Sequence, residues 1–108
     1  MASYTITVPS QLPYAISKTL TLTTADTITI TSPCAYEVRI INRAASQTIY
    51  VRADGVTAVA AADAAIPVLP SITAEPLEWC VGAGVSAISI VGSADPYSVV
   101  CTPINAGS

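Results

Sequence analysis

Apolar residues recur at every second position over most of this 108-residue chain. In the segment YEVRI, Tyr36, Val38 and Ile40 alternate with Glu37 and Arg39. A period of two is typical of a β-strand with one buried face and one solvent-facing face. The same alternation occurs in SYTITV, KTLTLTT, DTITIT, QTIYVRA, PLEWC, VSAISIV and YSVVCT. The pattern therefore predicts an all-β protein.

Turn-forming residues divide these segments. They are Ser32-Pro33, Asp54-Gly55, Pro67 to Pro70, Gly82 to Gly84 and Asp95-Pro96. Short strands separated by turns at intervals of about 8–12 residues indicate a sandwich or barrel. We expect residues 1–108 to form a single-domain antiparallel β-sandwich, either a jelly roll or an immunoglobulin-like sandwich. Residues 1–13 are a candidate N-terminal arm, because two prolines set the first strand apart.

Residues 56–66, VTAVAAADAAI, fit two structures. Alanine is the best helix former, and Val59, Asp63 and Ile66 lie at helical spacing, so a short helix ending before Pro67 is one interpretation. A strand followed by a loop is the other. The Asp54-Gly55 dipeptide favours the second interpretation, because it is a strong signal for a tight hairpin turn.

The composition limits the classes of partner. Hydrophobic residues make up 52% of the chain and charged residues 10%, against about 25% charged in an ordinary soluble domain. So little charge indicates that part of the surface is covered by other subunits, and we expect a homo-oligomer. Nucleic acid is disfavoured as a partner by the net charge of −3 and the four basic residues. The apolar runs are shorter than the ~20 residues that a membrane span needs.

The residues needed for catalysis are largely missing from the sequence. There is no histidine, so neither a Ser-His nor a Cys-His arrangement can form. Most of the acidic residues fall in predicted turns or on strand faces. Cys34, Cys80 and Cys101 have the spacing of neither a zinc site nor a disulfide framework, so we expect free thiols. We predict no catalytic residue, no metal site and no cofactor.

Tyr50 and Arg52 are the candidate interface residues. Because Ile49 and Val51 are the apolar members of their strand, Tyr50 and Arg52 should share its outer face. An exposed tyrosine beside an arginine is typical of an interface anchor. A cross-strand pair between Glu37 and Arg52 would explain the arginine without any partner protein. In contrast to Tyr50, three aromatic residues are predicted to belong to the core: Tyr36, Trp79 and Tyr97.

Residues 36–79 carry a family resemblance. YEVRIINRAASQTIYVRADGVTAV followed by AIPVLPSITAEPLEW resembles a strand, loop and strand pattern of small tailed-bacteriophage capsid decoration (cement) proteins. The resemblance implies a non-enzymatic, all-β virion protein that assembles in the host cytoplasm and binds the major capsid protein on the capsid surface. It also implies a trimer. The alternatives are a head–tail adaptor or tail component, and a carbohydrate-binding or receptor-binding module.

Overall fold

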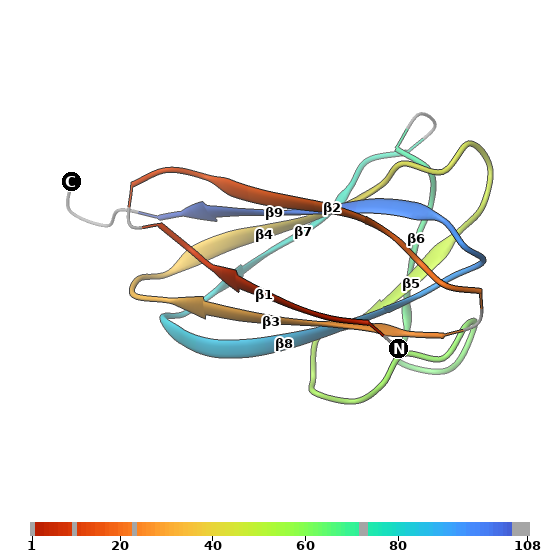
Figure 1. Ribbon diagram of the computed structural model, residues 1–108, viewed down its shortest axis with the longest axis horizontal. Coiled ribbons are helices and arrows are strands. Elements are labelled where there is room, and N and C mark those ends of the chain that lie inside the picture. The colour runs from red at the N-terminus through yellow and green to blue at the C-terminus, as the bar shows by residue number, and fades with distance from the viewer. Residues whose placement is uncertain (1, 10, 23, 72–73, 105–108) are drawn as a thin grey trace.

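This computed structural model describes residues 2–9, 11–22, 24–71 and 74–104. Within these ranges the chain forms nine strands, which lie in two facing sheets (Figure 1). The first sheet has the order β1-β3-β8-β5-β6, and the second has the order β2-β9-β4-β7. The strands are β1 (Ser3–Thr7), β2 (Tyr14–Thr19), β3 (Asp26–Ser32), β4 (Tyr36–Asn42), β5 (Ile49–Arg52), β6 (Ile66–Val68), β7 (Leu77–Val81), β8 (Gly84–Val91) and β9 (Pro96–Pro103).

The pairing of strands β2 to β9 is nested. β2 pairs with β9, β3 with β8, β4 with β7, and β5 with β6, and all four pairs are antiparallel. This is the strand order of a jelly roll. The predicted all-β sandwich is confirmed, and of the two topologies expected from the sequence the jelly roll is the one found.

β1 adds a ninth strand to the jelly roll. It pairs with β3 in parallel, so the sandwich is not wholly antiparallel. Ile6 and Val8 are fully buried, and the Val8 amide donates to the Thr31 carbonyl at 2.9 Å. Residues 3–8 therefore do not belong to the arm expected over residues 1–13, because β1 and Val8 supply core side chains to their own sandwich.

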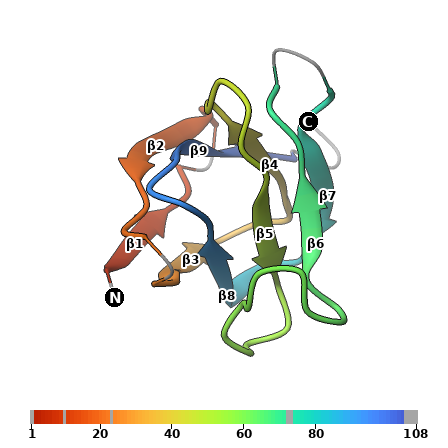
Figure 2. The same ribbon diagram turned by 90° about the vertical axis from the view of Figure 1, so that its right-hand side faces the viewer.

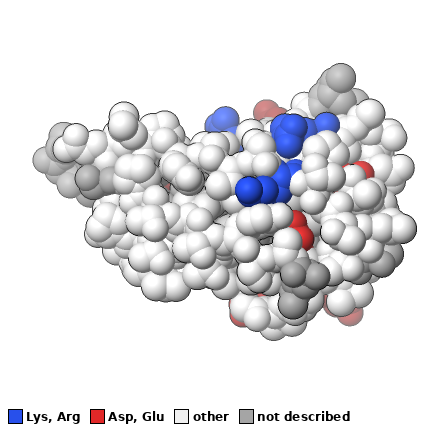
Figure 3. Space-filling model, in the orientation of Figure 1, with Lys and Arg blue, Asp and Glu red and all other residues white. Residues whose placement is uncertain are grey.

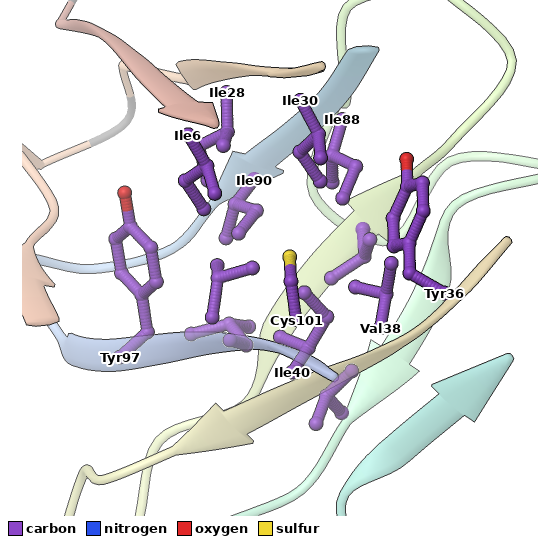
Figure 4. Close-up of a cluster of buried hydrophobic side chains, with 14 of the residues drawn as sticks. Ile6, Ile28, Ile30, Tyr36, Val38, Ile40, Ile88, Ile90, Tyr97 and Cys101 are labelled. Atoms are coloured by element: carbon purple, nitrogen blue, oxygen red, sulfur yellow. The ribbon is translucent and has the colours of Figure 1, made fainter. Parts of the chain in front are cut away.

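The core lies between the sheets and is rich in β-branched side chains (Figure 4). Such side chains suit a pleated surface, and burying one fully contributes about 1.5–3 kcal/mol. Tyr36 and Tyr97 lie at opposite ends of the cluster, with Cys101 between them. Both tyrosines are fully buried, and Trp79 is half-buried against the same cluster. These three aromatic residues thus contribute to the core, as predicted.

Buried polar groups of Tyr97, Asp26 and Asn42 have hydrogen-bond partners. The Tyr97 hydroxyl donates to Asp26 Oδ2 at 2.9 Å, and burial together with this carboxylate raises the pKa of Tyr97. The Asn42 side chain donates to the carbonyls of Gln47 and Val68 and accepts from the Ala44 amide. Asn42 therefore ties the end of β4 to both ends of the 43–48 connection and to β6.

One predicted strand is misplaced. KTLTLTT continues β2 only to Thr19, and Leu22 is exposed instead of facing the core. The Thr24 amide donates to the Thr21 carbonyl at 3.0 Å, which closes a turn and reverses the chain into β3. The alternation of Leu and Thr continues through this turn, so periodicity alone did not reveal the end of the strand.

Residues 53–65 form a loop without helix or strand (Figure 2). Asp54-Gly55 does not close a tight hairpin, because β5 pairs with β6 and Val51 lies opposite Ile66. The strand expected directly after Gly55 is wrong, whereas the loop expected in the alanine-rich part is present. Ala61 and Ala64 have φ angles of 57° and 66°, a left-handed conformation that no α-helix can include.

Candidate binding surface around Tyr50 and Arg52

Tyr50 lies on the outer face of β5, as strand parity predicted. Its ring is half-buried and packs against a small apolar cluster formed by Ala25, Ala58 and Val91. Ala58 belongs to the 53–65 loop, and its amide donates to Ser89 Oγ at 2.8 Å. The loop therefore folds back over the outer face of the first sheet and covers part of the tyrosine.

Arg52 has a partner within the chain. Its guanidinium donates from Nε to Asp54 Oδ1 at 3.1 Å and from Nη2 to Asp54 Oδ2. The Asp54 Oδ1 atom also accepts from the Val56 amide at 3.3 Å, and Gly55 adopts a φ of +82°. Aspartate commonly stabilises turns by bonding to the backbone two residues later, and glycine tolerates positive φ. Together these contacts turn the chain away from β8 after β5.

The ion pair shifts the pKa values of Arg52 and Asp54 in the directions expected for an arginine and a carboxylate that bind each other. The hydrogen bond from Arg52 holds the pKa of Asp54 below its ordinary value, and the hydrogen bond to Asp54 raises the pKa of Arg52. The Arg52 side chain is 19% exposed and that of Asp54 is 53% exposed, so the pair lies at the surface. Surface pairs of this kind add little to global stability, and the role of this pair is local.

The Glu37–Arg52 pair, which would have explained Arg52 without a partner protein, does not form. Glu37 belongs to β4 in one sheet, whereas Arg52 belongs to β5 in the other. The neighbouring Arg39 instead pairs with Glu78 on β7, with 3.2 Å between Nη2 and Oε1. Sequence reasoning missed Asp54 as the partner of Arg52, although an aspartate directly before a glycine is itself a turn signal.

Each of the four basic side chains has a partner within the chain. Lys18 Nζ lies 4.6 Å from the centre of the Tyr4 ring, and Arg43 donates to the Tyr97 carbonyl at 3.4 Å. The other two are the ion-paired arginines described above. Free basic charge is therefore not what this surface offers to a partner.

A hollow of about 260 Å³ adjoins Tyr50. It lies between β5, the end of β8 and the 53–65 loop. Apart from Tyr50 it is lined by small residues, none of them charged: Thr48, Ala58, Val59, Ala60, Val91, Gly92 and Ser93. Tyr50 and Arg52 share the outer face of β5, but Tyr50 borders this hollow, whereas Arg52 is held in its turn by Asp54.

Two further hollows, which the sequence did not indicate, meet at the side of the sandwich where β7 of one sheet faces β5, β6 and β8 of the other. One measures about 350 Å³ and lies between β7 and β8, and the other measures about 200 Å³ and reaches from β5 and β6 to β7. They adjoin because Ala53 and Trp79 line both. We call this combined hollow the β7/β8 groove. Its lining residues are Val51, Ala53, Ile66, Leu77, Trp79, Cys80, Val81, Gly82, Ser86, Ala87 and Ile88.

The groups able to hold a metal or react as nucleophiles are dispersed. Within the described ranges, no three His, Cys, Asp or Glu side chains gather to hold a metal ion, and no helix could cross a membrane. The three cysteines are unbonded thiols. Cys80 is exposed, Cys34 is half-buried and Cys101 is buried. Burial raises the pKa of Cys101 to about 11, which makes it a poor nucleophile at neutral pH.

No family model and no curated protein matches the chain. Among solved structures, it is similar to PliG of Aeromonas hydrophila, a periplasmic inhibitor of g-type lysozyme, at 12% identity and a TM-score of 0.50, over 94% of this chain and 96% of that one. It is also similar to the pre-peptidase C-terminal domain of Bacillus anthracis collagenase, at 14% identity and a TM-score of 0.48, over 91% of this chain and 93% of that one. A de novo designed double-stranded β-helix is similar at 8% identity and a TM-score of 0.45, over 82% of this chain and 96% of that one. At such identities, the likeness to PliG shows a shared β-fold and carries no activity with it.

Proposed function

We propose that this protein is a non-enzymatic virion structural protein, a decoration protein that binds and stabilises the assembled phage capsid. The resemblance of residues 36–79 to capsid decoration proteins supports this function. The jelly roll is compatible with it, because viral capsid domains use the same fold, although lectins and cupins use it too. That part of the support is an analogy at the level of the fold.

The observation that carries the proposal is the nature of the surface. The face in Figure 3 bears a few basic side chains in its upper middle part and a few scattered acidic ones, and most of its area is uncharged. Large apolar side chains are exposed among the described residues, and most are aliphatic, which suits contact with protein better than stacking against a sugar ring. They are Leu12, Tyr14, Leu22, Val56, Val59, Ile66, Leu69, Val85 and Ile104.

The proposed partners are the major capsid protein and sister copies of this chain, with a homotrimer as the bound form. Stabilisation follows from mass action. A protein that binds only the assembled shell stabilises it by RT ln(1 + [L]/Kd) at each site, and a shell offers many equivalent sites. Contacts through uncharged surface are compatible with this mechanism, because affinity then depends little on salt.

Tyr50 and Arg52 are the proposed contact residues on β5. Tyr50 offers the exposed part of its ring beside an uncharged hollow. The Arg52 guanidinium is held in place by Asp54, and its planar fork of donors suits a further bond to a carbonyl or carboxylate of a partner. The substitution Arg52→Glu tests this role. The variant should fold and bind shells weakly, and Arg39→Glu, on the opposite sheet, is the matched control. Normal shell binding by Arg52→Glu would remove Arg52 from the interface.

Sedimentation of empty shells with added protein, followed by electron microscopy, tests the function. We expect co-sedimentation to saturate at a stoichiometry set by the lattice, with density on the outer surface of the shell. Binding at one vertex alone would favour a head–tail adaptor, and binding to tail fibres would favour a tail component. Retention on a glycan array without binding to shells would favour the carbohydrate-binding alternative.

A further inference from the structure

Half of one edge of β8 has no neighbouring strand. β3 pairs with β8 along all of Gly84–Ile90, but β5 pairs with it only at residues 89, 90 and 91. Residues 84–88 therefore lack a strand on the β5 side within the part of the chain that the structure describes. In an antiparallel strand, alternate residues direct their N–H and C=O groups to each side, so this edge presents free backbone donors and acceptors.

The turn after β5 keeps this edge open. If β5 continued straight beyond Arg52, residues 53–57 would pair with the rest of β8. Instead, the bonds from Arg52 and Val56 to Asp54 and the positive φ of Gly55 turn the chain onto the outer face, where the Ala58 amide bonds to Ser89. A strand position is thus left vacant beside β8.

The vacant position adjoins the β7/β8 groove. Ser86, Ala87 and Ile88 of β8 line the groove on one side, and Trp79 and Val81 of β7 line it on the other. No lining residue is charged. On the outer face of the same edge, Val85 is 72% exposed. A strand placed here would bury one row of side chains in the groove and set the other row beside Val85.

We propose that residues 84–88 of β8 and the β7/β8 groove form a strand-addition site, which takes up an extended, uncharged segment of the capsid lattice protein with apolar residues at every second position. Backbone bonds to the open edge supply affinity, and the uncharged groove selects the alternating apolar side chains. This assignment of the partner rests on the proposed function.

A sister copy is a poor donor for this site. Strands β1 to β9 are already hydrogen-bonded within their own sandwich, and the apolar faces of the long strands form its core. To donate one of them, a sister copy would have to give up its own core contacts. A different protein with a free extended segment has no such cost, so we assign the lattice protein as the donor.

A model peptide tests the site independently of the function. The probe is blocked Thr-Val-Thr-Val-Thr-Val-Thr, and the control peptide has glutamate in place of each valine. Titration of the valine peptide into labelled protein should shift the amide resonances of residues 84–88 and the Trp79 indole resonance. It should also protect Cys80, which is exposed in the groove wall, from alkylation.

Two loop variants test whether the peptide binds in the β7/β8 groove. Ala53 is exposed and lines both parts of the groove, so Ala53→Lys places a charge at its mouth and should weaken peptide binding at least about tenfold. Ala62→Lys, on the same loop and outside the groove, should bind like the wild type. Absence of peptide-induced shifts at residues 84–88, or equal binding by Ala53→Lys, would overturn the strand-addition site.

Binding to empty shells then tests whether the lattice protein supplies the added strand. Amide exchange on bound shells should slow at residues 84–88. If shells bind without slowing this exchange, the lattice protein does not use the site, and the proposed function stands. If the peptide binds and shells do not, the site stands and the proposed function fails.

Discussion

Gly92 is the residue with the least free space around its Cα among the glycines of the described ranges. An added Cβ would lie 2.8 Å from Asp95 Oδ2, 3.0 Å from Leu20 Cδ1 and 3.1 Å from Ile49 Cγ2. Gly92→Ala should therefore lower the free energy of unfolding by about 1–3 kcal/mol. Gly82→Ala is the control, because nothing lies within 4 Å of its added Cβ. Denaturant titration measures the stability of both variants. Equal stability of Gly92→Ala and Gly82→Ala would contradict the close packing around Gly92.

The hydroxyl of Tyr97 is the donor that satisfies a buried carboxylate. Asp26 is 1% exposed and accepts from this hydroxyl at 2.9 Å. Tyr97→Phe leaves the carboxylate without this bond and should cost about 1–3 kcal/mol of unfolding free energy. Tyr36→Phe, which breaks a bond to the hydroxyl of Ser86, should cost less because no charged group is involved. A Tyr97→Phe variant as stable as the wild type would mean that Asp26 does not depend on Tyr97.

The pH dependence of the turn after β5 should follow Asp54. Because Arg52 lowers the pKa of this carboxyl, the ion pair is intact above the ordinary value of 3.8 and is lost as the pH falls through the lowered pKa. Amide exchange at residues 55–58 should therefore accelerate in acid, after correction for the intrinsic rate. Asp54→Asn should show fast exchange at every pH. An acid response that persists in this variant would assign the transition to another group.

The three thiols should react in the order of their exposure. Cys80 should be alkylated first in the native protein, followed by Cys34, and Cys101 should react only after unfolding. The raised pKa of Cys101 adds to its protection, since the thiolate is the reactive form. Mass spectrometry of timed alkylation would show the order. Rapid native labelling of Cys101 would contradict its position in the core.

At the scale of elements, β1 is where the sequence-based prediction and the structure differ most. Ile6→Ala removes a fully buried side chain from the core and should cost about 2–5 kcal/mol, whereas Thr5→Ala, on the exposed face, should change stability by less than about 0.5 kcal/mol. Melting both variants separates a core strand from an arm. If both substitutions lowered stability by the same small amount, the result would favour an arm over a core strand.

Alternation along the chain predicted the buried and exposed faces of β3, β4 and β5 correctly. It could not give the strand order, because pairing between distant strands leaves no local signal, nor the parallel pairing of β1. The Asp54-Gly55 signal misled because the same dipeptide suits an open turn. Asp54 bonds to Arg52 and to the Val56 backbone instead of closing a hairpin. The β7/β8 groove was unpredictable for the same reason, since it depends on where β5 stops beside β8.

At the scale of the whole molecule, the low charge and the exposed aliphatic side chains should favour self-association. We expect a trimer on the shell, and light scattering at micromolar concentration should give a mass above the 11.0 kDa of one chain. A monomer in solution together with isolated single copies on the shell would contradict the proposed trimer.

The most direct test of the proposed function is the temperature at which empty shells open, measured by calorimetry as the protein is added. If the protein binds the assembled shell and not its separated subunits, the opening temperature should rise with occupancy and level off when the sites are full. Ala62→Lys should reproduce this rise. An opening temperature that stays constant at saturating protein would contradict a stabilising role on the capsid.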